Sequence, residues 1–254
     1  GSVTSNEATL TVSLPTTLAG FNNGLLAYYP FNGNANDESG NGHHGTVNGA
    51  TLSTDRYGTE NKAYNFDGVD DYIEVIETAK NTDFDFSTPF SFSSWVKLSE
   101  TSYESIYRND GDFLFYVLNG HFHGEIFQGT TIKDFKCSTP ITANRWYQLS
   151  STWDGTQWVM YIDGIEQNST LSTRTLAGGS HPTRIGRANP SNGELSGKTD
   201  DIRLYNRALS TSEVTQLHTL EAPPVITAQP QDKTIGTGAN VTLTADANGT
   251  GLSY

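Results

Sequence analysis

The stretch of sequence that decides the fold class runs from residue 146 to residue 164. It reads Trp146-Tyr147-Gln148-Leu149-Ser150-Ser151-Thr152-Trp153-Asp154-Gly155-Thr156-Gln157-Trp158-Val159-Met160-Tyr161-Ile162-Asp163-Gly164. Its two Asp-Gly dipeptides favour the tight turns that join antiparallel strands. The residues between them are rich in aromatic and β-branched types, which are typical of strands. The stretch therefore predicts two short strands joined by a turn, with a second turn at its end.

The same pattern recurs on the N-terminal side of this stretch. Residues 113–118 and 122–127 flank Asn119-Gly120, a strong hairpin signal. Residues 89–98 alternate so that one strand face carries Phe90, Phe92, Ser94, Val96 and Leu98. Short strands at regular spacing with glycine turns predict an antiparallel sandwich or jelly roll.

One helix is predicted near the C-terminal end of this β region. Ser210 and Glu213 have the spacing of a capping box, in which each side chain bonds the backbone N–H of the other residue. Val214 and Leu217 then share one face over about two turns.

Composition limits the classes of partner. The 254 residues carry a formal net charge of -13 and 11% aromatic residues. An acidic surface repels phosphate backbones and anionic lipid, so we expect no nucleic-acid partner, and no apolar run is long enough for membrane insertion. The single cysteine, Cys137, excludes an internal disulfide, and we interpret it as a small buried hydrophobe.

The chain divides into three zones. Residues 8–14 alternate as one exposed strand, and Pro223-Pro224 is a stiff linker to strands at 225–230 and 241–245. The segments on both sides resemble parts of bacterial immunoglobulin-like domains. We therefore predict the last strand of a truncated immunoglobulin-like domain at 1–15, a jelly-roll domain at 22–221 and the first strands of another truncated immunoglobulin-like domain at 223–254.

The middle zone resembles the laminin-G-like, concanavalin A-like lectin/glucanase jelly-roll family. The resemblance rests on ordered segments at residues 26–33, 37–42, 66–73, 92–96, 161–164, 185–186 and 200–210. It implies an all-β, two-sheet antiparallel jelly-roll sandwich, here with one short C-terminal helix. It also implies that a calcium ion often joins the N-terminal loop to the final strand, and that members bind glycans, bind proteins or only space other domains.

Catalysis is not predicted. Glycoside hydrolysis needs one carboxyl group to protonate the leaving oxygen and another to attack or to activate water. Residues 82–86 carry only two carboxylates, Glu125 stands alone on its strand, and no Gly-x-Ser-x-Gly segment occurs. We predict that the protein is not an enzyme, and a glycoside hydrolase survives only if two carboxylates lie about 5–10 Å apart in an open cleft.

A metal site is predicted between the two ends of the middle zone. Calcium prefers carboxylate, amide and carbonyl oxygens, and Asp200 has the parity of the inward-facing Ile202 and Leu204. The residues alone equally fit a hydrogen-bonded loop, and the resemblance favours a structural calcium ion. The predicted ligands are Asn32, Asn34, Asp37, Asn41 and Asp200. We interpret the acidic cluster Asp67, Asp70 and Asp71 as turn chemistry.

A glycan site is predicted from strand parity. His121, His123 and Glu125 share the face opposite Phe122 and Ile126, and Trp95 has the parity opposite to Phe92. With the aromatic and basic residues between 103 and 108, they offer a shallow cleft. The predicted ligand-binding residues are Trp95, Tyr103, Tyr107, Arg108, His121, His123 and Glu125, although each also fits an ordinary packed or strand position.

These observations predict a non-catalytic carbohydrate-binding or adhesion module of a larger bacterial protein. We expect it to be secreted or at the cell surface, monomeric, stabilised by calcium, and bound to a polysaccharide or glycan and to neighbouring domains of its parent chain. The alternative is a calcium-stiffened spacer or protein-interaction domain without glycan binding.

Overall fold

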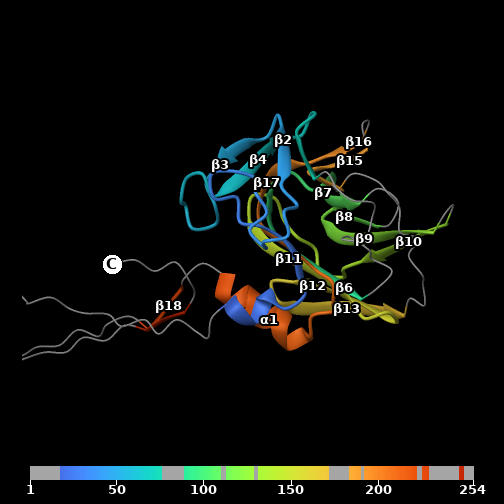
Figure 1. The fold of residues 1–254 in the computed structure, drawn as a ribbon. Coiled ribbons are helices and arrows are strands. Elements are labelled where there is room, and N and C mark those ends of the chain that lie inside the picture. The colour runs from blue at the N-terminus through green and yellow to red at the C-terminus, as the bar shows by residue number, and fades with distance from the viewer. Residues whose placement is uncertain are drawn as a thin grey trace, which may run out of the picture.

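The computed structural model describes residues 18–75, 89–109, 113–128, 131–171, 183–189, 192–221, 225–228 and 246–248. The predicted strands at 8–14 and 241–245 and the two carboxylates of residues 82–86 lie outside these ranges. Two large antiparallel sheets pack against each other within the described ranges (Figure 1).

The larger sheet has eight strands in the order β13-β12-β11-β6-β17-β4-β3, and β1 also pairs with β17. Its strands are β1 (Leu25–Tyr29), β3 (Thr51–Ser53), β4 (Ala63–Asp67), β6 (Phe90–Leu98), β11 (Trp146–Trp153), β12 (Gln157–Ile162), β13 (Ile165–Leu171) and β17 (Ser196–Tyr205). The pairing of β1 with β17 joins the two ends of the domain, with Leu25 opposite Tyr205 and Tyr29 opposite Ile202. The hairpins predicted between residues 146 and 164 are present as β11, β12 and β13.

The smaller sheet has seven strands in the order β10-β9-β8-β7-β14-β5-β2. Its strands are β2 (Gly45–Asn48), β5 (Tyr72–Val75), β7 (Tyr103–Asn109), β8 (Phe113–Leu118), β9 (His121–Gln128), β10 (Thr131–Lys136) and β14 (Thr183–Ile185). Two further sheets, each of two antiparallel strands, are β15 (Arg187–Asn189) with β16 (Asn192–Glu194) and β18 (Val225–Ala228) with β19 (Asp246–Asn248). The short helices are η1 (Leu18–Asn22) and α1 (Thr211–Glu221).

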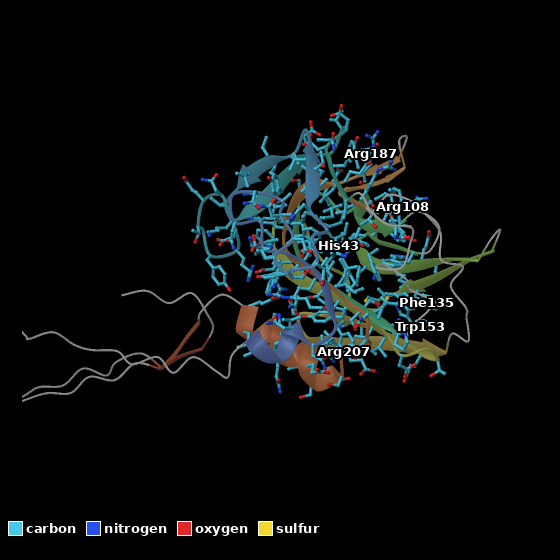
Figure 2. The ribbon with its side chains drawn as sticks, in the orientation of Figure 1. His43, Arg108, Phe135, Trp153, Arg187 and Arg207 are labelled. Carbon is cyan, nitrogen blue, oxygen red and sulfur yellow. The ribbon has the colours of Figure 1, made fainter. Side chains whose placement is uncertain are left out.

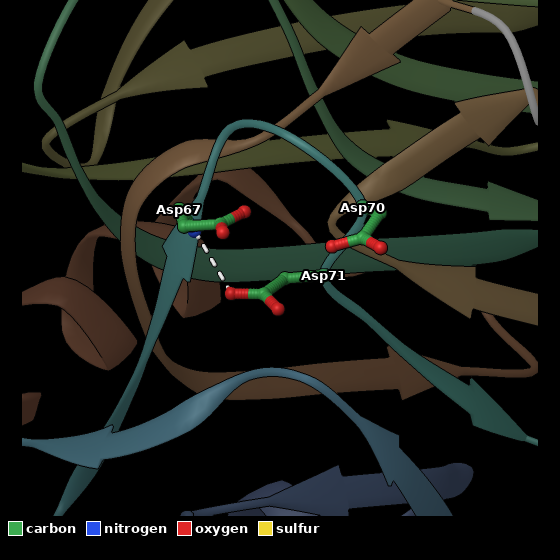
Figure 3. A group of neighbouring side chains, drawn as sticks. All are labelled: Asp67, Asp70 and Asp71. Carbon is green, nitrogen blue, oxygen red and sulfur yellow. Dashed lines mark hydrogen bonds between the residues drawn. The ribbon is translucent and has the colours of Figure 1, made fainter.

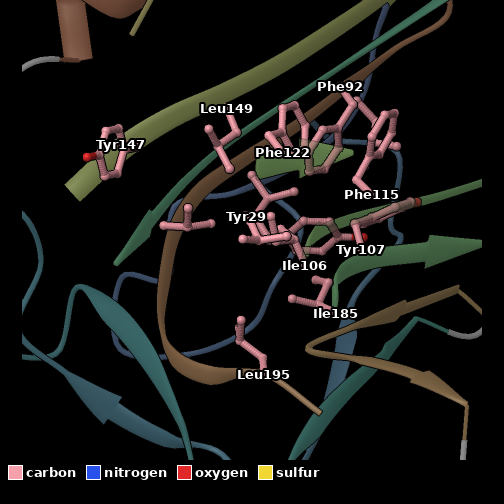
Figure 4. Close-up of a cluster of buried hydrophobic side chains, with 14 of the residues drawn as sticks. Tyr29, Phe92, Ile106, Tyr107, Phe115, Phe122, Tyr147, Leu149, Ile185 and Leu195 are labelled. Atoms are coloured by element: carbon pink, nitrogen blue, oxygen red, sulfur yellow. The ribbon is translucent and has the colours of Figure 1, made fainter. Parts of the chain in front are cut away.

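The core lies between the two large sheets and is largely aromatic (Figure 4). Phe92 of β6 stacks on Phe115 of β8 with ring centroids 4.5 Å apart, and Phe90 stacks on Phe113 at 5.1 Å. The predicted inward face of 89–98 is confirmed, since Phe90, Phe92, Val96 and Leu98 all belong to this cluster. Cys137 is also buried in it, where burial raises the pKa of its thiol to about 12.

Helix α1 packs on the outer face of the eight-stranded sheet (Figure 1). The capping box is confirmed, because the Ser210 N–H donates to Glu213 Oε2 at 2.8 Å and the Glu213 N–H donates to Ser210 Oγ at 3.3 Å. Val214 and Leu217 pack on Tyr161 and Tyr205 in a second apolar cluster. The helix begins at Thr211 and ends at Glu221, longer than the two turns predicted.

We expect the docking of helix α1 to depend on pH through His218. The His218 ring stacks on the Trp95 ring with centroids 5.4 Å apart. Gly164 packs against the same histidine, and a Cβ atom on residue 164 would lie only 2.9 Å from the His218 Cβ. Burial lowers the pKa of His218, with Arg56 and Arg145 adding to the decrease and Asp163 opposing it. The folded state therefore takes up this proton less readily than the unfolded state, whose histidine titrates near pH 6.5.

When a base has a lower pKa in the folded state than in the unfolded state, the free energy of unfolding is unaffected by its titration above the unfolded pKa. Below that pKa, protonation favours the unfolded state, and stability is lost as the pH falls. We therefore expect His218→Gln to lose less stability than the unaltered protein between about pH 7.5 and about pH 5.5. Urea unfolding at both pH values measures this difference. The reverse result, a steeper loss in the variant, would show that the imidazole is protonated in the folded state.

Candidate functional site

Asp37 is one of the predicted calcium ligands, and its carboxylate organises the loop between β1 and β2 through hydrogen bonds. Oδ1 accepts the N–H groups of Tyr28 and Ser39 at 2.9 and 2.8 Å. Oδ2 accepts the Ser39 hydroxyl at 2.8 Å and the His43 N–H at 3.0 Å. Burial alone would raise the pKa of Asp37, but these hydrogen bonds outweigh burial and hold the pKa below its ordinary value. Both oxygens are therefore satisfied by protein donors.

Asp200 is also satisfied within the protein. Its Oδ2 lies 2.5 Å from Arg56 Nη1, and its Oδ1 accepts the Asp201 N–H at 2.8 Å. Asp201 has a φ of 46° at an irregularity in the pairing of β17 with β6, and this turns its carboxylate toward Arg56 Nη2 at 2.7 Å. Burial and the charge of Asp201 raise the pKa of Asp200 well above its ordinary value, although Arg56 opposes them.

The three predicted asparagine ligands have separate partners. Asn34 Oδ1 accepts the Asn36 N–H, Asn41 Nδ2 donates to two carbonyls of β1, and Asn32 Oδ1 accepts Lys62 Nζ at 2.7 Å. A cavity of about 210 Å³ is lined by Asn32 and Asp200 of the predicted set, together with the cations Arg56 and Lys62. Asp55 and Asp201 also line this cavity, and Asp37 does not. The presence of calcium in the protein stays a prediction.

Asp67, Asp70 and Asp71 form a group of carboxylates within 4.8 Å of one another (Figure 3). Asp71 Oδ2 accepts the N–H of Asp67 at 2.9 Å, and Asp67 Oδ1 accepts the Val69 N–H at 2.8 Å. These bonds agree with the interpretation of the group as turn chemistry between β4 and β5.

The Trp95 side chain lies outside the inter-sheet core, as its parity predicts, but it does not line an open cleft. It is 2% exposed on the outer face of the eight-stranded sheet, below α1 and the loop before β4. Its Nε1–H donates to Glu221 Oε2 at 3.0 Å, and the Arg56 guanidinium lies 4.8 Å from its ring centroid. The expectation of an exposed Trp95 is wrong because the outer face of this sheet is covered.

The prediction that Tyr107 lines a ligand cleft is also wrong, since Tyr107 is fully buried in the inter-sheet core. Tyr103 and Tyr107 have the same parity, but an irregularity in the pairing of β7 with β8 lies between Ser105 and Tyr107. A bulge of this kind shifts the alternation by one residue. Tyr103 therefore faces outward and Tyr107 inward.

The other predicted ligand residues lie on the outer face of the seven-stranded sheet. On this face the Tyr116 hydroxyl donates to Glu125 Oε1 at 2.8 Å and contacts Asp134 Oδ1 at 3.4 Å. His123 Nδ1 lies 2.8 Å from Asp134 Oδ1, and its ring stacks on Tyr116 with centroids 4.9 Å apart. Tyr103 meets the ring of Tyr116 edge to face at 5.3 Å. We call Tyr103, Tyr116, His123, Glu125 and Asp134 the outer-face cluster.

Sequence reasoning missed Tyr116 and Asp134. In the structure Tyr116 lies opposite His123 and Asp134 lies opposite Glu125. These pairs follow from the register of β8, β9 and β10, which strand parity in the sequence does not give. Of the remaining predicted residues, His121 is the first residue of β9, and its Nδ1 lies 3.0 Å from the Cys137 carbonyl oxygen. Arg108 lies on the same outer face, two strands from Glu125.

The β15–β16 hairpin packs over part of this face. Ala188 contacts Leu114 and Tyr116, which leaves Tyr116 only 3% exposed. Gly193 has a φ of 80° and lies against the Tyr103 ring, so a Cβ there would come within 2.6 Å of it. The side chain of Asp134 remains 45% exposed at the other side of the cluster.

The fold and these sites agree with a known family. A family model described as the concanavalin A-like lectin/glucanases superfamily, Laminin_G_3, matches residues 67–215, more than half of the chain. The chain belongs to this superfamily. The predicted two-sheet jelly-roll class is thereby confirmed, while the immunoglobulin-like flanks at 1–15 and 223–254 stay predictions.

Solved structures share the fold of this concanavalin A-like domain at low identity. The binding domain of Paraclostridial Mosquitocidal Protein 1 matches with a TM-score of 0.68 and 17% identity over 82% of this chain and 57% of that one. Domain 4 of AbnA, an extracellular arabinanase from Geobacillus stearothermophilus, was solved with arabinotriose. It matches with a TM-score of 0.62 and 22% identity over 76% of this chain and 98% of that one. The ligand binding domain of botulinum neurotoxin serotype D was solved with N-acetylneuraminic acid. It matches with a TM-score of 0.62 and 15% identity over 79% of this chain and 52% of that one.

These identities show a shared fold alone. The concanavalin A-like domain spans little more than half of the two toxin domains, but nearly all of the arabinanase domain. Among curated proteins, no relative matches the chain. No helix in the described ranges is long and apolar enough to cross a membrane.

The outer-face cluster of the concanavalin A-like domain contains a carboxylate pair, Glu125 and Asp134, which share the Tyr116 hydroxyl. Hydrolysis also needs an open cleft and a group prepared for attack. Burial and the hydrogen bond to Glu125 raise the pKa of Tyr116, so its phenol stays protonated and donates. Two cavities of about 210 and about 260 Å³ are lined by other residues.

Proposed function

We propose that the domain is a non-catalytic glycan-binding module and that the outer-face cluster is its ligand site. The observation that carries the proposal is a pair of partly exposed carboxylates, Glu125 and Asp134, which both contact the hydroxyl of the buried Tyr116 and lie beside the partly exposed ring of Tyr103. Aromatic rings pack on the apolar faces of a ligand, and a few fixed polar groups orient it. Carboxylates accept hydrogen bonds, which suits the many hydroxyl donors of a sugar.

The cluster is prepared for such a ligand. Glu125 and Asp134 each direct one oxygen to Tyr116, and within the described residues the other oxygen of each accepts no hydrogen bond. Burial and the charge of Glu125 raise the pKa of Tyr103, so this phenol also stays a donor. Support also comes from the shared fold, since the arabinanase domain was solved with a bound oligosaccharide.

A second function has one observation in its favour. The β15–β16 hairpin covers Leu114 and part of the tyrosine pair, so the sheet face is not an open groove throughout. A protein-interaction or spacer domain without glycan binding fits this cover. We propose action outside the cell for either function, supported by the extracellular arabinanase that shares the fold.

Glu125→Gln is expected to weaken glycan binding about tenfold, because a hydrogen bond to a charged group contributes about 1.5–3 kcal/mol. Calorimetry against neutral and acidic polysaccharides, after a glycan array has chosen the probes, measures the loss. Glu166→Gln is the matched control, since Glu166 is exposed on β13 of the other sheet. Equal affinities of the two variants would move the site away from the cluster. A lack of binding by the unaltered protein to every polysaccharide would leave the interaction or spacer function.

A further inference from the structure

A cavity of about 210 Å³ lies where the end of β1, the loop that joins β3 to β4, and β17 meet. It is the cavity lined by Asn32, Arg56 and Lys62, and it is separate from the outer-face cluster. Figure 1 shows β3 and β4 on the opposite side of the molecule from β9 and β10. In Figure 2, Phe135 of β10 lies on the opposite side of the molecule from the loop between β3 and β4. A ligand in this cavity therefore binds apart from the cluster.

The backbone around this cavity is held in an unusual conformation. Phe31, Asn61 and Asp201 have φ values of 47°, 61° and 46°, in the left-handed region that residues other than glycine rarely adopt. They are three of the six non-glycine residues with positive φ in the described ranges. The Gly33 N–H donates to the carbonyl oxygens of Phe31 and Asn61 at 2.8 and 2.9 Å, which joins the two loops. Strained backbone of this kind gathers at ligand sites, where the surrounding structure maintains it.

Asn32 and Lys62 directly follow two of these strained residues, and both line the cavity. Lys62 Nζ donates to Asn32 Oδ1 at 2.7 Å. Within the ranges that the structure describes, this is the one hydrogen bond that either side chain makes. An ammonium group has three donors and a side-chain amide has two. Two ammonium donors and both amide N–H groups are therefore available to a ligand.

Asp55 supplies an acceptor to the same cavity. Its Oδ1 accepts the N–H groups of Tyr57 and Thr59, both at 2.8 Å, and these bonds fix the loop between β3 and β4. Its Oδ2 accepts no hydrogen bond from any residue that the structure describes. The Thr59 side chain also lines the cavity, and a hydroxyl both donates and accepts. The cavity thus offers donors and acceptors together.

The charges that line the cavity nearly cancel. The carboxylates belong to Asp55, Asp200 and Asp201, and the cations are Arg56 and Lys62. Arg56 already pairs with Asp200 and Asp201, at 2.5 and 2.7 Å. A strongly charged ligand of either sign would therefore meet repulsion as well as attraction. A neutral ligand with several hydroxyl groups bonds to Lys62 and Asp55 without that repulsion.

We infer that this cavity is a second ligand site and that it takes one neutral sugar unit, such as the end of a polysaccharide chain. Sugar hydroxyls donate and accept hydrogen bonds, which matches the available groups of Lys62, Asn32 and Asp55. Tyr28 and Pro30 add apolar lining for a face of the sugar ring. Drug-sized ligands occupy about 300–1,000 Å³, so a cavity of about 210 Å³ suits a smaller unit. The inference goes beyond the proposed function, because it stands on different residues in another part of the fold.

Saturation-transfer difference NMR with monosaccharides tests the site. The neutral probes are glucose, galactose, mannose, arabinose and N-acetylglucosamine, and glucosamine and glucuronate are the charged comparisons. Every sample carries Glu125→Gln, so that binding at the outer-face cluster is weakened throughout. We expect at least one neutral sugar to bind. Lys62→Met and Asp55→Asn are each expected to lower its affinity about tenfold, because each removes a charged hydrogen-bonding group.

The controls separate the cavity from general effects of substitution. Lys97→Met is the matched control, because Lys97 is a half-buried lysine of β6 that does not line the cavity. Asp55→Asn keeps the Oδ1 acceptor that fixes the loop between β3 and β4. Lys62→Arg keeps a charged donor and is expected to retain more affinity than Lys62→Met. The melting temperatures of all variants show whether each one is folded.

Three results would overturn the inference. No binding of any neutral monosaccharide would remove the site, and it would leave the proposed function, which polysaccharide binding at the cluster tests separately. Equal losses in Lys62→Met and Lys97→Met, both folded, would move the binding away from the cavity. Tighter binding of glucosamine or glucuronate than of every neutral sugar would overturn the assignment of a neutral ligand.

Discussion

Arg56→Ala is expected to lower the free energy of unfolding by about 3–5 kcal/mol, which is the usual cost of removing one partner from a buried ion pair. The Arg56 side chain is 3% exposed and lies between Asp200 and Asp201. Removing it leaves the Asp200 carboxylate buried without its cation. Asp201 keeps the hydroxyl of Tyr28 and a longer contact of 3.9 Å with Arg203.

The same arginine also ties the end of helix α1 to the sheet. Its Nε–H donates to the carbonyl oxygen of Glu221, the last residue of the helix, and the Tyr57 hydroxyl donates to the same oxygen, both at 2.5 Å. A cation at a helix C-terminus is favourable because the last carbonyls carry partial negative charge. The Glu221 side chain pairs with Arg203 and accepts from Trp95 and Gln148. The loss of Arg56 therefore weakens the docking of the helix as well as the acidic pair.

Urea unfolding followed by circular dichroism measures the effect, and tryptophan fluorescence reports on Trp95 beneath the guanidinium. Arg145→Ala is the matched control, with an expected change of less than about 1 kcal/mol, because its ion pair with Asp163 is exposed. A loss in Arg56→Ala as small as that of Arg145→Ala would mean that water enters the site and solvates the aspartates.

Asp37→Ala is expected to cost about 3 kcal/mol, since four hydrogen bonds each contribute about 0.5–1.5 kcal/mol and the exposed loop re-solvates part of the loss. The four donors are the N–H groups of Tyr28, Ser39 and His43 and the Ser39 hydroxyl. The Tyr28 bond attaches the loop to β1, which pairs with β17. Asn34→Ala is the control, because Asn34 is exposed and bonds only the nearby Asn36 N–H within the described residues.

The same variants test the calcium prediction when the melts are repeated with a chelator. Because protein donors already satisfy Asp37 and Asp200, we expect Asp37→Ala to be equally destabilised with and without the chelator. An ion bound only by the folded state would instead stabilise the unaltered protein and lose its effect in Asp37→Ala. A fall in melting temperature on chelation, absent in the variant, would establish the calcium site.

Strand parity correctly predicted the sheet face that several of the candidate residues take. His123 and Glu125 lie on the outer face as their alternation with Phe122 predicts, and Trp95 leaves the core. Parity says which face a side chain takes, but it does not say what covers that face. Trp95 is hidden because helix α1 and Arg56 pack on it from distant parts of the chain. One irregularity in β7 was enough to reverse the prediction for Tyr107.

By itself, the sequence determined the all-β class, the hairpins, the capped helix and the family, because turn dipeptides, alternation and capping residues act over a few neighbours. Tertiary structure alone decided which polar residues meet. Arg108 and Arg184 are brought together by the order β7-β14-β5, and Tyr116 meets Asp134 across two strand pairings. Asp37 and Asp200, expected to share an ion, found separate protein partners. The physical reason is that charges and hydrogen-bond groups act through space, and strand order is set by the packing of the whole sandwich.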